Sequence, residues 1–293
     1  MSQKIIREKT SDINSVLRNS GISDKEISEI ADMILGVNKR RPFLGEIIHW
    51  MVDADKLDYL PRDSHSTGFL PSLVQSAPII DSIKLSEEHI VFDKSAIPYL
   101  ESMVFAEALY YNNIHHHPLV RKADQTLSRA IKIAIEKGAT KPLDIQRMTD
   151  NQIINFLKKM GEKAAHLVLR MQNKPLHTIL TINWEELDKD AIKQVLKIKD
   201  NYQKREKLES AIASHVGDDP DFVMLDIPPL PYIQEADTPI ITEEEEVKLL
   251  KGVSNLTRVI SENHYNQWSL CVYSEKECKK SMESLREFLL SQI

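Results

Sequence analysis

The sequence predicts a mainly α-helical protein with a small β-hairpin and a C-terminal lobe of mixed helices and strands. Apolar residues recur at helical spacing through most of the first half. The 293 residues include only eight glycines and contain neither a GxGxxG nor a GKS/T motif, which disfavours dinucleotide-binding and P-loop folds. Short stretches typical of strands are confined to residues 82–93 and the second half. We therefore expect two parts, 1–140 and 141–293.

The first half reads as a series of helices. One amphipathic helix should run from about Ile5 and stop at Gly21, and Ser23 with Glu26 forms a capping box for the next. The stretch "SIKLSEEHIVFD" has two apolar runs around a pair of glutamates and predicts a hairpin. A long helical segment follows at 96–136, interrupted only by Pro118 and ended by Gly138.

The second half changes character. "TDNQIINFLKKMGEKAAHLVLRM" and "KREKLESAIASHVG" predict helices, with Thr149 and Gly217 as caps. "DFVMLDIPPLPY" predicts a strand that runs into an extended proline-rich edge, and "WSLCVY" predicts another strand before a last helix at 275–290. The run "EEEE" at 243–246 is expected to be the acidic first turn of a helix.

The stretch "VDADKLDYLPRDSHSTG" at 52–68 concentrates ionisable residues. If it is helical, Asp55, Tyr59 and Asp63 share one face with Lys56 beside them. Such a run is either a solvated helix with surface ion pairs or a site, because flanking apolar residues place it against a core where carboxylates need partners or a metal. Pro61 should kink the helix or mark a new first turn.

Bulk properties exclude several classes of function. The formal net charge of −6 argues against general nucleic-acid binding, which needs a basic surface. No apolar run has membrane-spanning length, and "MSQKIIREKTSD" lacks the apolar region of a signal peptide. Cys271 and Cys278 are too few for a disulfide framework or a cysteine-rich zinc site. We expect a cytoplasmic protein without a membrane partner.

The histidines give weak metal signals. His115, His116 and His117 are consecutive, so helical geometry lets no more than two face one ion. Of the remaining histidines, His65 is the one close to the charged run on a plausible shared face.

These residues carry a family resemblance. "DADKLDYLPRDSHSTG" resembles a segment of HD-superfamily phosphohydrolases, in the branch of the deoxynucleoside triphosphate triphosphohydrolases and the human sterile-alpha-motif HD-domain dNTPase. The resemblance extends to "ISEIADMILG" upstream and "YYNNIHHHPLVRKA" downstream, and more weakly to "KREKLESAIASHVGDDPDFVMLDIPP". It implies that 1–140 is the C-terminal portion of an HD-type domain and 141–293 a helical and mixed lobe.

The resemblance also implies roles. It makes Asp55 a metal ligand and His65 a catalytic histidine near the phosphates. The expected substrate contacts are Lys56 at the triphosphate, Tyr59 against the sugar, Asp63 at the ribose 3′ hydroxyl, and Tyr111 and His117 on a helix bordering the nucleotide. The residue types suit this chemistry, since a carboxylate is a hard metal ligand or a hydroxyl acceptor and an ammonium suits phosphate.

Some positions depart from the family pattern. Glu107 stands where related enzymes often carry arginine and would repel a triphosphate, His115 stands at a position commonly tyrosine, and Pro61 at one commonly leucine or alanine. No His-Asp doublet occurs in the sequence. The resemblance places the histidine and the HD doublet of the metal site before Met1, so we expect the divalent ion only when those ligands are supplied.

Two functions remain open. The chain is either most of a metal-dependent phosphohydrolase for (deoxy)nucleoside triphosphates or related phosphate esters, inactive as it stands, or a non-catalytic nucleotide-binding, oligomerisation or scaffold module. The row Asp55, Lys56, Tyr59 and Asp63 favours the first function, whereas Glu107 and the absent doublet favour the second. The resemblance also leads us to expect a homo-oligomer.

Overall fold

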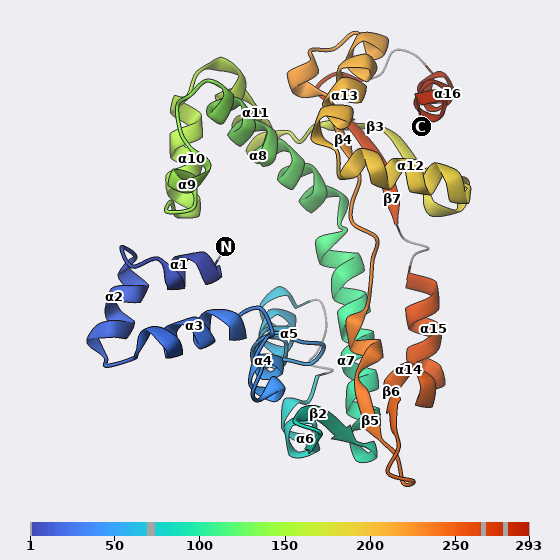
Figure 1. Cartoon of the computed structure of the whole chain (residues 1–293). Coiled ribbons are helices and arrows are strands. Elements are labelled where there is room, and N and C mark those ends of the chain that lie inside the picture. Colours follow the sequence, from blue (N-terminus) through green and yellow to red (C-terminus); the bar gives the residue numbers. More distant parts are fainter. Residues whose placement is uncertain (1, 69–73, 265–267, 278–280, 293) are drawn as a thin grey trace. The chain divides into compact units, whose positions relative to one another are not determined.

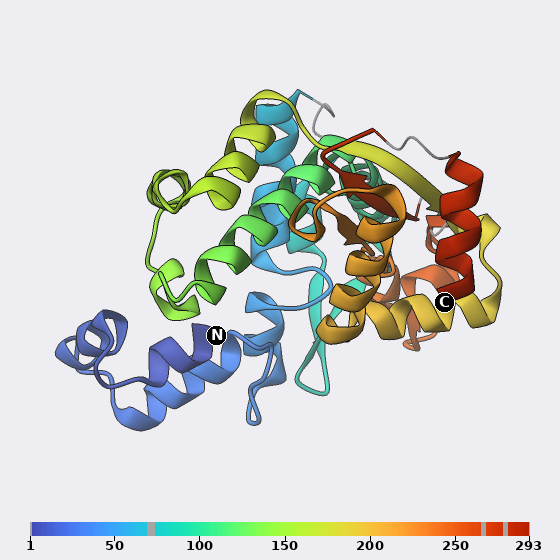
Figure 2. The ribbon, with the colours of Figure 1, turned by 90° about the horizontal axis from the view of Figure 1, so that it is seen from above.

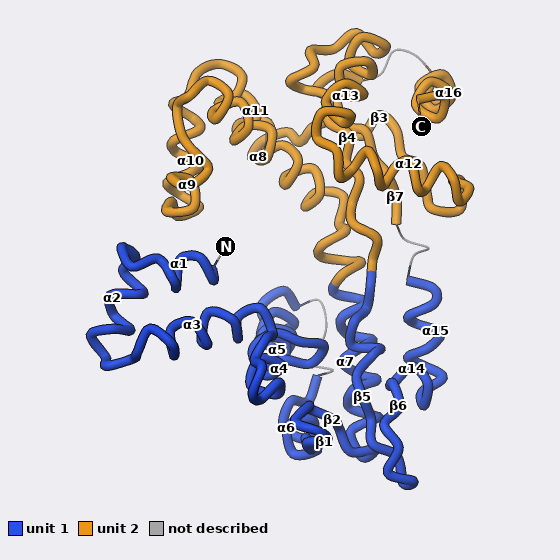
Figure 3. The backbone as a smooth tube through the Cα atoms, in the orientation of Figure 1, with its two compact units in different colours: residues 1–110, 232–264 blue, residues 111–231, 265–293 orange. Residues whose placement is uncertain are grey.

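The computed structural model describes residues 2–68, 74–264, 268–277 and 281–292. The described part is mainly helical with two small sheets, so the predicted fold class is confirmed (Figure 1). Within it, no helix is long and apolar enough to cross a membrane. The chain forms two compact units, residues 1–110 with 232–264 and residues 111–231 with 265–293 (Figure 3).

Unit 1 consists of helices and one four-stranded sheet. Its helices are α1 (Ser2–Arg7), α2 (Asp12–Asn19), α3 (Asp24–Met33), α4 (Pro42–Ile48), α5 (Ala54–Thr67), α6 (Ser76–Asp81), α7 (Ile97–Tyr110), α14 (Leu250–Val253) and α15 (Asn255–Asn263), with short 3-10 turns η1 (Lys94–Ala96) and η5 (Gln234–Asp237). Its strands are β1 (Ile83–Ser86), β2 (His89–Asp93), β5 (Pro239–Ile241) and β6 (Val247–Leu249), in the order β1-β2-β5-β6.

Unit 2 surrounds a three-stranded antiparallel sheet in the order β3-β7-β4. Its elements are the π-turn η2 (Tyr111–His115), α8 (Pro118–Glu136), α9 (Pro142–Ile145), α10 (Asp150–Lys159), α11 (Glu162–Asn173), β3 (His177–Asn183), η3 (Trp184–Glu186), α12 (Lys189–Lys199), α13 (Tyr202–Val216), η4 (Pro220–Phe222), β4 (Met224–Asp226), β7 (Ser269–Ser274) and α16 (Met282–Gln292). Helices α8 and α11 run side by side in both views (Figures 1 and 2).

The division of the chain differs from the expected boundary at residue 140. That position falls inside unit 2, and unit 1 is completed by the returning segment 232–264. The reason is a pairing that local patterns do not reveal: β5 pairs in parallel with β2, joining Phe92 to Ile240. Both side chains are fully buried, and they share one core with Leu60 of α5 and Leu100 of α7.

The predicted hairpin is confirmed. Strands β1 and β2 pair from Ile83 opposite Phe92 to Ser86 opposite His89. Glu87 and Glu88 form the two-residue loop, with φ of 49° and 66°. Two successive left-handed residues are what the tightest hairpin turn requires. The register therefore directs Ile90 and Phe92 into the core of unit 1.

Several local signals end helices where predicted. The Ser23–Glu26 capping box opens α3, and a second box joins Thr149 to Gln152 at the start of α10. Gly217 ends α13 in the left-handed conformation with φ of 73°. Strands β4 and β7 also form as predicted, and β4 is an edge strand. The last helix begins at Met282, later than expected, and Cys278 lies outside the described residues.

Two predicted elements are wrong. The first amphipathic helix is broken into α1 and α2, because Ser11 caps α2 and its hydroxyl donates to the carbonyl oxygen of Ile5 at 2.6 Å. Asn14 likewise donates to Ile6 O at 2.7 Å. The glutamates at 243–246 do not start a helix; they belong to the turn between β5 and β6, and Glu245 has φ of 60°. Pairing of β6 with β5 overrides the local charge signal there.

Helix α5 continues through Pro61 in place of the new start that its proline suggested. Proline has no N–H, so the carbonyl of Leu57, four residues earlier, loses its usual helical donor. The hydroxyl of Ser76 donates to that oxygen instead, at 2.7 Å. A side chain from the following helix therefore replaces the missing backbone bond and permits an unbroken α5.

This substitution of donors predicts a coupling between the two positions. We expect Ser76→Ala to lower the free energy of unfolding by about 1–2 kcal/mol, because it leaves a partly buried carbonyl unpaired. Pro61→Ala restores an N–H, so Ser76→Ala should cost much less in that background. A double-mutant cycle by urea denaturation measures the coupling. Strictly additive losses would show that the Ser76 bond does not compensate for Pro61.

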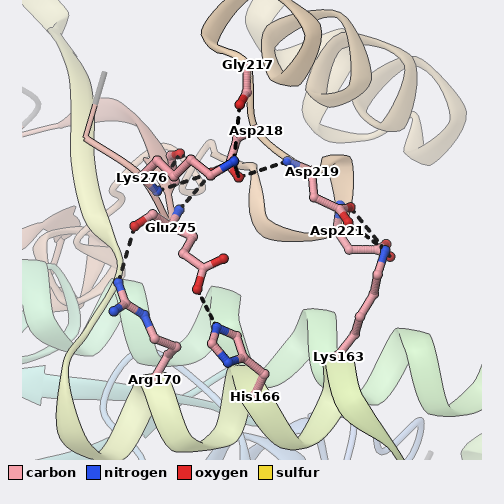
Figure 4. Close-up of polar contacts among 10 residues, drawn as sticks. Lys163, His166, Arg170, Gly217, Asp218, Asp219, Asp221, Glu275 and Lys276 are labelled. Atoms are coloured by element: carbon pink, nitrogen blue, oxygen red, sulfur yellow. Dashed lines mark hydrogen bonds and ion pairs between the residues drawn. The ribbon is translucent and has the colours of Figure 1, made fainter. Parts of the chain in front are cut away.

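In unit 2, a buried carboxylate ties two loops together (Figure 4). The Asp218 side chain, 1% exposed, follows α13 and accepts from the Ser274 hydroxyl at 2.6 Å and from the backbone N–H groups of Glu275 and Lys276. Burial alone would raise the pKa of Asp218, but these hydrogen bonds hold the pKa below its ordinary value. The loop after β7 is thereby fixed to the end of α13.

Candidate functional site

Helix α5 presents the charged row that the sequence indicated. Its N-cap is Asp53, whose Oδ1 accepts from the N–H of Lys56 at 2.9 Å and whose Oδ2 accepts from that of Trp50 at 3.1 Å. The helix ends at Gly68, with φ of 64°. The row is thus helical as predicted, and Asp55, Tyr59 and Asp63 follow one another at four-residue spacing.

Lys56 points into the protein. Only 8% of the residue is exposed, and its Nζ lies 2.5 Å from Oε1 of Glu235, which is 2% exposed. The ammonium also donates to the carbonyl oxygens of Trp50 at 3.2 Å and Met51 at 3.0 Å. All three of its protons therefore have partners inside unit 1. A phosphate could bind Lys56 only if the Lys56–Glu235 pair opened.

Tyr59 and Asp63 meet two residues of helix α7. The Tyr59 hydroxyl donates to Oε2 of Glu107 at 3.4 Å, and the Tyr110 hydroxyl donates to Oδ2 of Asp63 at 3.1 Å. The two tyrosine rings lie 6.1 Å apart between centroids. We call Tyr59, Asp63, Glu107 and Tyr110 the Tyr59 cluster; all four side chains are half-buried. It combines two phenols with two carboxyl groups.

Two groups of the Tyr59 cluster, Glu107 and Tyr59, have raised pKa values. Burial, reinforced by the negative charge of Glu235, raises the pKa of Glu107 to about 7, although Lys56 acts in the opposite sense. Burial and the Glu107 charge also raise the pKa of Tyr59 well above its ordinary range. Near neutral pH, Glu107 is therefore protonated in a large fraction of molecules and repels an anion less than a full carboxylate would.

The two ends of the row are exposed. Asp55 and His65 both face solvent, and neither side chain forms a hydrogen bond or ion pair in the described part of the chain. Asp63 keeps Oδ1 without a hydrogen-bond partner among the described residues. These three groups are consequently available to a ligand.

The residues do not by themselves fit a metal centre. A catalytic ion needs about three protein ligands plus an open position. Among residues 2–68, 74–264, 268–277 and 281–292, no three His, Cys, Asp or Glu side chains come together in an arrangement that could hold a metal. Asp55 supplies one carboxylate, so a divalent ion there would require further ligands.

Tyr111 and His117 belong to unit 2, whereas α5 belongs to unit 1. Tyr111 starts the π-turn, and its ring lies 4.3 Å from that of His116. His117 caps α8, with Nδ1 accepting from the N–H of Leu119 at 3.3 Å. Burial, with the nearby charge of Arg121, lowers the pKa of His116 to about 4, so this imidazole is neutral at physiological pH.

Two residues that contact the charged row, Tyr110 and Glu235, were not predicted from the sequence. Tyr110 follows Glu107 by three residues and so shares its helical face, a signal that was present in the sequence. Glu235 gave no such signal, because it reaches Lys56 across 179 positions. The proposed roles of the individual site residues stay predictions.

Solved structures share this fold. A phosphohydrolase from Bacteroides thetaiotaomicron superposes with a TM-score of 0.58 at 19% identity, over 94% of this chain and 75% of that one. A hypothetical protein from Aquifex aeolicus gives 0.65 at 18% identity, over 99% and 74% of the two chains. These likenesses show that the chain shares the fold of these two proteins.

The chain belongs to the HD associated region family, whose model matches residues 74–291. It is 30% identical over 258 residues to an uncharacterised protein of Methanocaldococcus jannaschii, covering 87% of this chain and 55% of the relative. It is 26% identical over 120 residues to the uncharacterised protein YwfO of Bacillus subtilis, covering 41% and 27%. The chain therefore spans about half the length of the archaeal relative. Its match to the bacterial relative covers about a quarter of that protein.

Proposed function

We propose that this chain supplies the nucleotide-recognising part of an HD-type phosphohydrolase that acts on (deoxy)nucleoside triphosphates. The observation that carries the proposal is the Tyr59 cluster, in which Asp63 offers an unused carboxylate oxygen beside a half-buried tyrosine ring. Asp63 would accept from the sugar 3′ hydroxyl, and Tyr59 would pack against the sugar face. A carboxylate acceptor of this kind distinguishes a hydroxyl from its absence.

The phosphates would be met by other residues of the same row. His65 is exposed at the far end of α5 and would serve as the catalytic histidine near the phosphates. Lys56 would join them on leaving Glu235. Tyr111 and His117 are the two further residues that we propose as nucleotide contacts. Asp55 would contribute one ligand to a divalent ion, completed by ligands beyond those described here.

A second candidate is a non-catalytic nucleotide-binding, oligomerisation or scaffold module. Two observations favour it: the Lys56 ammonium is engaged internally, and the described residues bring no three metal ligands together. The two candidates differ in whether the complete protein hydrolyses nucleotides, and we propose a homo-oligomeric state for both. On either, we propose that the chain by itself does not hydrolyse nucleotides.

The binding proposal is tested with a pair of ligands. dATP should raise the melting temperature of the chain by linkage, and dideoxy-ATP, which lacks the 3′ hydroxyl, should raise it less. Asp63→Asn should remove most of the difference between the two ligands, because the charged acceptor is gone. Asp58→Asn is the matched control, since Asp58 lies on the same helix but is exposed and pairs with Arg62.

Three results would contradict the proposal. The first is an equal shift with dATP and dideoxy-ATP in the unmodified chain. The second is an unchanged difference in Asp63→Asn. The third is phosphate release by the chain alone with magnesium or manganese. That result would overturn the proposed inactivity only, because nucleotide binding is tested by the first two measurements.

A further inference from the structure

A small hollow in unit 2 lies apart from the Tyr59 cluster. Its lining residues belong to α8, α13 and β4, and its volume is about 110 Å³. Pockets for whole drug-sized ligands run to roughly 300–1,000 Å³, so this one accommodates a single small group. Seven of its eight lining residues carry a polar or charged group, alongside the apolar parts of their side chains: Gln125, Ser128, Arg129, Lys132, Tyr202, Arg205, Glu209 and Met224. We call it the Arg205 pocket.

Two of its cations are held in place by acidic neighbours. Arg129 is paired with the buried Glu209 and donates through Nη1 to the carbonyl of Pro220 at 2.8 Å. Glu209 in turn accepts from the N–H of Leu225 at 3.0 Å. Each carboxylate oxygen of Glu209 thus already has a donor, and the Arg129 charge neutralises it. The Arg129–Glu209 ion pair therefore lines one side of the pocket without a net charge.

Lys132, the second of these cations, is also held by an acidic neighbour and lies over an aromatic ring. Its Nζ lies 2.6 Å from Oε1 of Glu206 and 5.1 Å from the centre of the Tyr202 ring. Tyr202, as a residue, is 45% exposed. Lys132 and Tyr202 thus both line the hollow, with the ammonium over the ring of a tyrosine that is partly open to solvent.

Among the remaining polar lining residues, Gln125 donates to Oδ1 of Asp226 at 3.2 Å, whereas Arg205 and Ser128 have no side-chain partner among the described residues. Arg205 is partly buried, yet its guanidinium forms no hydrogen bond or ion pair in the described part of the chain, and the same holds for the Ser128 hydroxyl. Glu209 pairs with Arg129, and Glu206 and Glu136 both pair with Lys132, so Arg205 is the cation of the pocket that has no carboxylate at ion-pair distance among the described residues. A planar guanidinium with unused donors is the side chain best suited to two oxygens of one anion.

We propose that the Arg205 pocket binds a phosphoryl group, with Arg205 as the bidentate donor and Ser128 as a further donor. The group is either free phosphate or the phosphate end of a larger molecule whose aromatic ring stacks on Tyr202. This site lies wholly in unit 2 and does not depend on the nucleotide assignment made for the Tyr59 cluster.

Calorimetric titration of the full chain with inorganic phosphate, at constant ionic strength, tests the site. Arg205→Gln should weaken binding about tenfold or more, as expected for loss of a charge-assisted hydrogen bond. Ser128→Ala should weaken it by a smaller factor. Arg147→Gln is the matched control, because Arg147 is exposed elsewhere in unit 2 and undergoes the same change of charge. Binding to Arg147→Gln should equal that of the unmodified chain.

Titration with adenosine monophosphate separates the two sources. Tighter binding than phosphate, with the gain lost in Tyr202→Leu, identifies the phosphate end of an aromatic ligand, whereas equal affinities identify free phosphate. The proposal is overturned if no phosphate binding is detected, or if Arg205→Gln and Arg147→Gln bind phosphate equally.

Discussion

Replacing Lys56 by methionine is expected to lower the free energy of unfolding by about 3–5 kcal/mol, the largest effect of any single change discussed for this chain. Methionine matches the lysine stem but leaves Glu235, 2% exposed, as a buried charge without its cation. It also leaves the carbonyls of Trp50 and Met51 without the donor that now serves both. Removing one partner of a buried pair is costly because the other loses its compensation.

The measurement combines urea denaturation with hydrogen exchange of α5 and η5, where the local loss of protection should concentrate. Arg62→Met is the matched control: its pair with Asp58 lies on the same helix, but both side chains are more than 60% exposed. That variant should lose less than about 0.5 kcal/mol. Equal losses in the two variants would show that the Lys56–Glu235 pair is not buried in solution.

Glu107→Gln is expected to stabilise the chain by about 1–3 kcal/mol at pH 8 and to have little effect near pH 4. Since burial raises the pKa of Glu107 from 4.5 to about 7, the folded state holds this proton more tightly than the unfolded chain. Between those two pH values the folded state binds more protons, so stability falls as pH rises. Glutamine retains a group that Tyr59 can contact without ever taking a charge.

Stability of the parent and variant, measured from pH 4 to pH 8, checks the sign. The difference between them should grow through the window from 4.5 to about 7 and level off above it. Glu262→Gln, an exposed glutamate of the same unit, should give a pH-independent difference. A constant difference for Glu107→Gln as well would mean that the Glu107 carboxyl is ordinary in solution.

Local structure was largely predictable from the sequence, since caps and turns depend on neighbouring residues. Ser23 with Glu26, Thr149 with Gln152, and Gly217 each act within four positions, and each lies where predicted. The failures are cases where a distant segment prevailed. The glutamates at 243–246 resemble a helical first turn until β6 pairs with β5. Strand β3 was not predicted, because its partner β7 lies about ninety residues later.

In the candidate site, too, the features set by nearby residues were predictable and those set by distant segments were not. Helical spacing predicted that Asp55, Tyr59 and Asp63 would lie on one helix, and α5 confirms that spacing. The direction of Lys56 was not predictable, because Glu235 enters from a segment far along the chain. Helical phase alone could have identified Tyr110 as a neighbour of Glu107.

The parallel pairing of β2 with β5 bears on how this protein is made. A ribosome that has just released Asp93 must still synthesise the whole of residues 111–231 before Ile240 and Ile241 emerge, a delay on the order of ten seconds. Throughout that interval the nascent first unit carries Lys56 without Glu235 and a sheet edge without its neighbour. The segment 111–231 can form its helices meanwhile, but β3 and β4 pair only with β7, at residues 269–274, so the sheet of unit 2 forms after the last strand of unit 1 has emerged.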